Sequence, residues 1–101
     1  MTEPTPPDDD LTTLRIRIEG FVQSVGFRNF AITEARRLAL DGWVRNRFDG
    51  TLEILVSGPN ADVETFVGLC MRGPAGARVN DIELHKAEPP AEKGFRRRSS
   101  F

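Results

Sequence analysis

The chain has 101 residues, of which 39% are apolar and 29% are charged, and its net charge is -1. This length suits a single domain with one hydrophobic core. Fourteen basic residues against fifteen acidic ones give no overall attraction to nucleic acids or anionic lipids. No apolar run approaches the roughly 20 residues that a membrane-spanning helix needs, and a single cysteine excludes an internal disulfide. We therefore expect a cytoplasmic protein that binds neither membranes nor nucleic acids.

The first half of the chain predicts a tail, a strand and a helix. Residues 1–13 contain three prolines and no core-forming pattern, which is typical of a flexible tail. The alternation of apolar and polar residues in LRIRIEGFV predicts a strand that begins at Leu14 and buries one face. Helical spacing of apolar residues then predicts a helix from about Arg28 to Leu40. We expect Gly42 to be its left-handed C-terminal residue.

The second half predicts a hairpin, a helix and a final strand. Alternation predicts strands from Trp43 to Arg47 and from Leu52 to Val56, joined by a turn that carries Asp-Gly. Apolar residues from Val63 to Met71 follow helical spacing, and Cys70 lies on that stripe as a small buried hydrophobic residue. A fourth strand follows, and its spacing implies an irregularity near Asn80-Asp81.

The resulting order, β-α-β-β-α-β, predicts an α+β fold of the ferredoxin-like type. In this split βαβ arrangement both helices pack on one face of an antiparallel sheet. We expect the domain to cover residues 14–95. Residues 96–101 would form a basic C-terminal tail, because three consecutive arginines interrupt any further strand alternation. The alternatives are a last strand that stops near Phe95 or a fully solvated tail.

The segment VQSVGFRN, residues 22–29, joins the first strand to the first helix. Such a turn leaves backbone N–H groups without partners beside the positive end of the helix dipole. Gly26 lets the backbone bend closely around a ligand, and Arg28 adds a planar guanidinium that matches phosphate oxygens. A lone Gly-x-Arg is also typical of a structural turn with a solvated arginine. Because a cation at a helix N-terminus is unfavourable unless an anion lies between them, the pattern favours a phosphate site.

Two motifs resemble a known family. GFVQSVGFR is similar to the acylphosphatase signature G-x-V-Q-G-V-x-F-R, and GWVRNRFDGTLE is similar to the family's second motif, G-W-V-x-N-x-x-D-G-x-x-E. RGPAGARVNDIE resembles the segment after the family's second helix, so the similarity spans residues 14–88. The family has a ferredoxin-like fold and hydrolyses acyl phosphates to a carboxylate and inorganic phosphate without metal or cofactor. The resemblance therefore implies a hydrolase of small acyl phosphates with no cofactor and no metal ligands, and we expect a monomer.

The resemblance also implies roles for individual residues. Arg28 matches the family's phosphate-binding arginine, and Asn46 matches the asparagine that orients the attacking water. The loop whose backbone amides cradle the phosphate matches Val22, Gln23, Ser24, Val25, Gly26 and Phe27. Ser24 stands where the family usually has glycine. A positive φ there would cost about 1–2 kcal/mol of strain, or the hydroxyl could donate to the phosphate.

Only the match to the second motif marks Asn46 as a functional residue. Alternation from Trp43 puts Val44 and Asn46 on one face of the strand. The period does not say whether that face meets the loop at residues 22–28. An asparagine near a turn is usually solvated, so the motif, and not the geometry, carries this assignment.

The residue types suit this chemistry, since neither motif contains a histidine, a cysteine or a pair of carboxylates. The leaving group of an acyl phosphate is a carboxylate with a pKa of about 4, so it departs without being protonated. Positioning and electrostatics then do most of the work. One alternative is a non-catalytic module that binds phosphate or carbamoyl phosphate, because the domain also occurs, by family resemblance, in large carbamoyl-transferring hydrogenase maturation proteins. The other is a nucleic-acid-binding sheet, against which the near-neutral charge argues.

Overall fold

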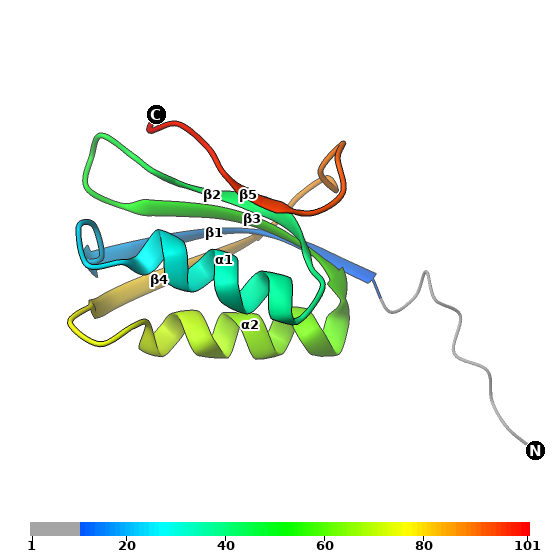
Figure 1. Ribbon diagram of the computed structural model, residues 1–101, viewed down its shortest axis with the longest axis horizontal. Helices are drawn as coiled ribbons and strands as arrows, with labels where there is room; N and C mark the ends of the chain where they lie inside the picture. The colour runs from blue at the N-terminus through cyan, green and yellow to red at the C-terminus, as the bar shows by residue number, and fades with distance from the viewer. Residues whose placement is uncertain (1–10) are drawn as a thin grey trace, which may run out of the picture.

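The computed structural model describes residues 11–101 as two helices packed on one face of a five-stranded sheet (Figure 1). In chain order the elements are β1 (Leu11–Phe21), α1 (Phe27–Arg37), β2 (Asp41–Asn46), β3 (Leu52–Pro59), α2 (Asn60–Arg72), β4 (Arg78–Lys86) and β5 (Phe95–Arg97). The strand order is β4-β1-β3-β2-β5. The pairs are antiparallel except for β2 and β5, which run parallel. This is the predicted ferredoxin-like α+β fold with an added edge strand. Within these residues, neither helix is long and apolar enough to cross a bilayer.

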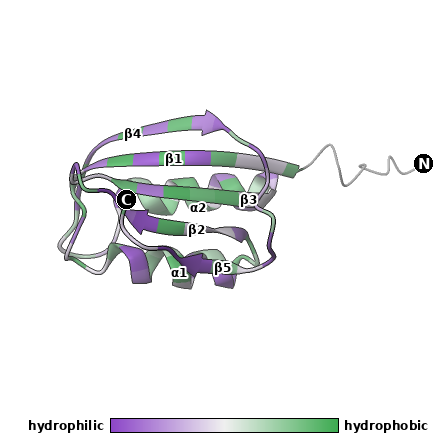
Figure 2. Ribbon diagram, turned by 90° about the horizontal axis from the view of Figure 1, so that it is seen from above, coloured by the Kyte–Doolittle hydropathy of each residue, from purple (hydrophilic) through white to green (hydrophobic). Residues whose placement is uncertain are grey.

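The core lies between the sheet and the two helices. Hydrophobic and hydrophilic residues alternate along β1 (Figure 2), so only one face of this strand is apolar. The buried core residues are Ile16, Ile18, Val22, Phe27, Ala31, Ala35, Leu40, Val44, Leu52, Ile54, Val56, Val63, Phe66, Cys70 and Phe95. The rings of Phe66 and Phe95 lie 6.0 Å apart, which anchors β5 to α2.

Both ends of the described domain extend beyond the predicted boundaries. Strand β1 begins at Leu11 instead of Leu14, and Thr12 pairs with Gly58 of β3. Residues 1–10 of the predicted tail lie outside the described residues. At the other end, β5 continues past Phe95 to Arg97. Strand pairing uses backbone groups, so consecutive arginines do not prevent it, and the predicted tail at 96–101 was wrong in its first residues.

The prediction for the end of α1 was also wrong. The helix stops at Arg37, and Ala39, with φ 57°, takes the left-handed position predicted for Gly42. The backbone N–H of Leu40 donates to the carbonyl of Ala35 at 2.9 Å, which closes the helix end. Gly42 instead lies in β2 with φ 139°.

The predicted irregularity near Asn80-Asp81 is confirmed as a break in the β1–β4 register. Glu19 pairs with Asp81, but Gly20 pairs with Val79. Asn80 is therefore an extra residue on β4, which is the definition of a β-bulge.

Gly42 gives a test of how tightly β2 is held against its neighbours. A Cβ at this position would lie 1.8 Å from the carbonyl oxygen of Leu55 on β3, and the φ is one that L-residues rarely adopt. We expect Gly42→Ala to lower the free energy of unfolding by more than about 2 kcal/mol, measured by urea denaturation. Gly50→Ala is the control, because φ is also positive there but the space is open; it should cost about 1 kcal/mol. An equal loss of unfolding free energy in the two variants would contradict the explanation by a clash with the Leu55 carbonyl.

Candidate active site

A cavity of about 190 Å³ lies where the β1–α1 loop meets the C-terminal ends of β2 and β5. Because β2 and β5 run parallel, their C-terminal ends lie at the same edge of the sheet, beside this loop (Figure 1). The lining residues are Val22, Ser24, Gly26, Phe27, Arg28, Asn29, Asn46 and Arg97. The structure thus brings together Arg28 and Asn46, the two residues for which the sequence predicts catalytic roles.

Residues of the β1–α1 loop, among them Ser24 and Gly26, line this cavity. Ser24 and Gly26 both have positive φ, 63° and 82°. The first hydrogen bond of α1 runs from the N–H of Phe30 to the carbonyl of Gly26 at 3.0 Å. The start of the helix has no side-chain cap and no acidic residue in its first turn. Its first N–H groups and the positive end of its dipole are therefore suited to an anion.

Gln23 and Val25 do not line the cavity, although both belong to the predicted phosphate loop. The side-chain amide of Gln23 donates to the carbonyls of Arg47 at 2.8 Å and Thr51 at 2.9 Å. Those two residues flank the β2–β3 turn, and they are themselves joined by a backbone hydrogen bond of 2.9 Å. Gln23 therefore fastens the loop to the hairpin that carries Asn46. Val25 packs against the core.

Asn46 is the last residue of β2 and faces the same side of the sheet as the buried Val44. The structure thus settles the question that the alternation left open. The Oδ1 atom of Asn46 is buried and has no hydrogen-bond donor among residues 11–101. Buried polar atoms are nearly always hydrogen-bonded, so this acceptor lacks the partner that such an atom usually has.

Two guanidinium groups, those of Arg28 and Arg97, adjoin the cavity. Neither forms an ion pair with a carboxylate in the part of the chain that the structure describes. Partial burial, and then the positive charge of Arg97, lower the pKa of the Arg28 guanidinium from its ordinary value. Arginine keeps its charge at neutral pH despite such shifts. The cavity is therefore positively charged.

The prediction from sequence missed Arg97 and Asn29. The signal for Arg97 was the buried Phe95, because residues two apart on a strand share a face. Asn29 carries no comparable signal in the sequence; the structure identifies it by its place in the cavity lining and by its hydrogen bond to Arg97.

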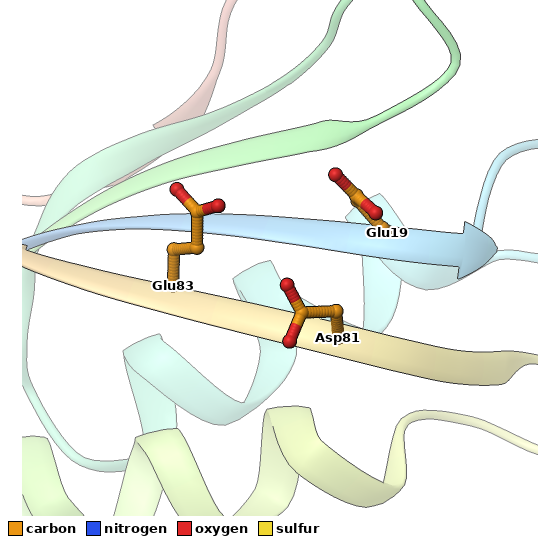
Figure 3. Close-up of side chains that lie close together, drawn as sticks. All are labelled: Glu19, Asp81 and Glu83. Atoms are coloured by element: carbon orange, nitrogen blue, oxygen red, sulfur yellow. The ribbon is translucent and has the colours of Figure 1, made fainter.

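Other chemically active side chains lie away from this cavity. Burial raises the pKa of the Cys70 thiol to about 12, which makes it unreactive. Three carboxylates, those of Glu19, Asp81 and Glu83, gather on β1 and β4 on the face of the sheet away from the helices (Figure 3). Arg17 pairs with two of them, Glu19 at 2.7 Å and Glu83 at 3.6 Å. Because two of the three carboxylates already pair with this guanidinium, we assign no metal centre there.

Comparison with known proteins decides the family. The family model for acylphosphatase matches residues 14–97. The chain belongs to the acylphosphatase family. An acylphosphatase from Acidiphilium cryptum is 57% identical over 83 residues, which are 82% of this chain and 91% of that protein. The structure of an acylphosphatase from Coxiella burnetii matches with a TM-score of 0.86 and 26% identity, over 94% of this chain and 100% of that one.

A third match is to a longer protein. T. kodakarensis HypF is 32% identical with a TM-score of 0.77, and the match covers 87% of this chain but 12% of HypF. The acylphosphatases, in contrast, match over almost their whole length. The chain is accordingly an acylphosphatase, a hydrolase whose substrates are small acyl phosphates, as the motifs predicted.

The link made by Gln23 can be tested by removing its side-chain amide. We expect Gln23→Ala to lower the rate of acyl phosphate hydrolysis by about tenfold or more, because small displacements of catalytic groups are costly. Stability should fall by about 1–2 kcal/mol, since two side-chain-to-backbone hydrogen bonds are lost. Steady-state kinetics and urea denaturation would measure the two effects. An unchanged rate combined with lowered stability would show that the link does not position Asn46.

The strain at Ser24 predicts that glycine stabilises this loop. A non-glycine residue at positive φ costs about 1–2 kcal/mol, and part of the gain is offset because glycine makes the unfolded chain more flexible. We expect Ser24→Gly to raise the free energy of unfolding by about 0.5–1 kcal/mol. Ala39→Gly is the matched control, because Ala39 has a similar φ at the far end of α1. If Ala39→Gly raises the free energy of unfolding but Ser24→Gly lowers it, the Ser24 hydroxyl makes a stabilising contact.

Proposed function

We propose that the enzyme cleaves acyl phosphates by in-line attack of a water that Asn46 orients. Arg28 and the backbone amides of the loop from Val22 to Phe27 hold the phosphate. The observation that carries this proposal is the buried, unpartnered Oδ1 of Asn46 beside the same cavity as the Arg28 guanidinium. An acceptor and a cation on one cavity supply the two functions that the reaction needs: an oriented nucleophile and a stabilised phosphoryl group.

The chemistry follows from these groups. The water donates one hydrogen bond to Oδ1 of Asn46, which aims its lone pair at phosphorus. The bond from phosphorus to the carboxylate oxygen breaks as the bond to the water oxygen forms. The water's proton passes to a phosphate oxygen, and the carboxylate leaves without protonation. Charge on the phosphoryl oxygens is spread over the guanidinium and the loop amides.

The finer predictions on partners and location belong to the same proposal. We propose a monomeric cytoplasmic enzyme that does not bind nucleic acid. The open face of the sheet supports the last of these points, the absence of nucleic-acid binding, because arginines there already have partners. Arg45 lies 2.7 Å from Glu53, and Trp43, the aromatic side chain on this face of β2, is covered by the guanidinium groups of Arg45 and Arg98. This leaves little surface on which a base could stack.

One alternative function has an observation in its favour. The match to a short part of HypF indicates that this fold also occurs as a module of longer proteins. A module that binds phosphate or carbamoyl phosphate without hydrolysing it would use the same cavity. The two functions differ in turnover, so a single assay separates them.

The assay follows hydrolysis of benzoyl phosphate by the wild type and by two variants. We expect Arg28→Ala and Asn46→Ala each to lower kcat by a factor of about 10²–10³, as loss of a group that stabilises or orients the reacting atoms does. Inhibition by inorganic phosphate should be lost only in Arg28→Ala. Arg37→Ala is the control for charge removal, because Arg37 lies at the other end of α1 and pairs with Glu34. Thermal unfolding would confirm that each variant is folded.

Two results would contradict the proposal. If the wild type leaves benzoyl phosphate intact but binds phosphate, the binding module is the correct function. If Asn46→Ala keeps full turnover, Asn46 does not orient the water. A phosphate monoester such as p-nitrophenyl phosphate should be a poor substrate, because its leaving group is a worse one than a carboxylate.

A further inference from the structure

Arg97 reaches the cavity because of its place on β5. This strand pairs in parallel with β2, and Arg97 lies opposite Val44. Residues two apart on a strand share a face, so Arg97 is on the same side as the buried Phe95. Arg96 is on the other face and pairs with Glu92.

Asn29 fixes the direction of the Arg97 side chain. Its Oδ1 atom accepts a hydrogen bond of 2.6 Å from Nη2 of Arg97. Asn29 lies in the first turn of α1, next to Arg28, and lines the cavity. A guanidinium has five N–H donors, so others remain for a ligand.

Holding β5 in place does not require this arginine. The strand is fixed by the ring contact of Phe95 with Phe66 and by the hydrogen bond from Nε of Arg36 to the Phe95 carbonyl, 3.0 Å. On either side, the N–H of Gly42 donates to the Gly94 carbonyl at 2.9 Å, and the N–H of Arg98 donates to the Val44 carbonyl at 2.9 Å. The strand therefore has several anchors besides the hydrogen bond from Arg97 to Asn29.

The charges indicate a role for the Arg97 side chain. Arg97 is close enough to Arg28 for its charge to disfavour protonation of that guanidinium. The cavity lining holds no carboxylate from the part of the chain that the structure describes. Two like charges beside each other are unfavourable unless an anion lies between them. A phosphate group offers several oxygens and can accept from both arginines.

We propose that Arg97 is a second phosphate-binding residue of this enzyme, with Asn29 as its positioning residue. Its guanidinium donates to the same phosphate group that Arg28 holds. The inference rests on the proposed function in one respect, that the phosphate of the substrate occupies this cavity. It adds a second cation, supplied by the C-terminal strand, to the groups that bind substrate and product.

Arg97→Gln tests this with inorganic phosphate as the probe. Calorimetric titration should give a phosphate Kd at least about tenfold higher than that of the wild type, because a charge-assisted hydrogen bond is lost. The KM for benzoyl phosphate should rise in parallel. Arg96→Gln is the matched control, since it removes the same charge from the adjacent residue, which lies on the opposite face. Its phosphate Kd and its KM should stay within about twofold of the wild-type values. Arg97→Lys, which keeps the charge but loses the planar fork, should be intermediate.

A thermal measurement separates binding from a merely structural role. Without phosphate, Arg97→Gln should unfold at the same temperature as the wild type or higher, since a like-charge repulsion is removed. With phosphate, its gain in Tm should be smaller than that of the wild type. A lowered Tm without phosphate, together with an unchanged phosphate-induced gain, would overturn the inference.

Failure of the inference and failure of the proposed function give different results. Suppose that the wild type hydrolyses benzoyl phosphate and that Arg28→Ala no longer binds inorganic phosphate, but Arg97→Gln binds phosphate normally. The proposed function then stands and the inference about Arg97 falls. If the wild type does not hydrolyse benzoyl phosphate, yet Arg97→Gln weakens phosphate binding, the inference stands and the catalytic proposal falls. If the wild type binds no phosphate at all, both fall.

Discussion

The hydrogen bonds from Gln23 to the β2–β3 hairpin are the constraint on which the site depends. They join the carbonyls of Arg47 and Thr51 to the loop that follows β1. The loop contains a strained Ser24, and besides these hydrogen bonds the buried Val22 and the core contact of Val25 hold it in place. A loop in an unfavourable conformation persists only when its surroundings over-determine it. The position of the loop relative to Asn46 therefore depends on side-chain contacts between elements far apart in the sequence.

Most of the fold could be predicted because the pattern of apolar residues is unambiguous on the buried faces. The alternation in β1 fits only a strand, and the spacing of apolar residues in α2 fits only a helix. Even the bulge at Asn80 was visible as a break in spacing. The ends of elements were less predictable, because backbone bonds decide them. Ala39, not a glycine, closes α1, and β5 continues through arginines because its ladder with β2 needs only N–H and carbonyl groups.

The site was predictable to the extent that the two motifs carry it. Arg28 and Asn46 were found because they belong to these motifs, and the structure places both beside one cavity. Arg97 was not found, since its function depends on which strand it pairs with. A parallel pairing of β5 with β2 brings it to the cavity, whereas a solvated tail would not. Local sequence places Arg97 two residues after the apolar Phe95, but it does not identify the strand with which β5 pairs.

Although the net charge is near neutral, arginines on the two faces of the sheet differ in whether they pair with carboxylates. On the open face Glu53 is almost fully buried among cations, at 2.7 Å from Arg45 and 3.2 Å from Arg47. These ion pairs partly offset the positive charge there. On the helix side, Arg28 and Arg97 have no such partner among the described residues. Since surface fields decay over about 8–10 Å in physiological salt, the attraction for an anion acts only close to the cavity. A protein of near-neutral net charge can therefore still present a locally positive cavity to an anion.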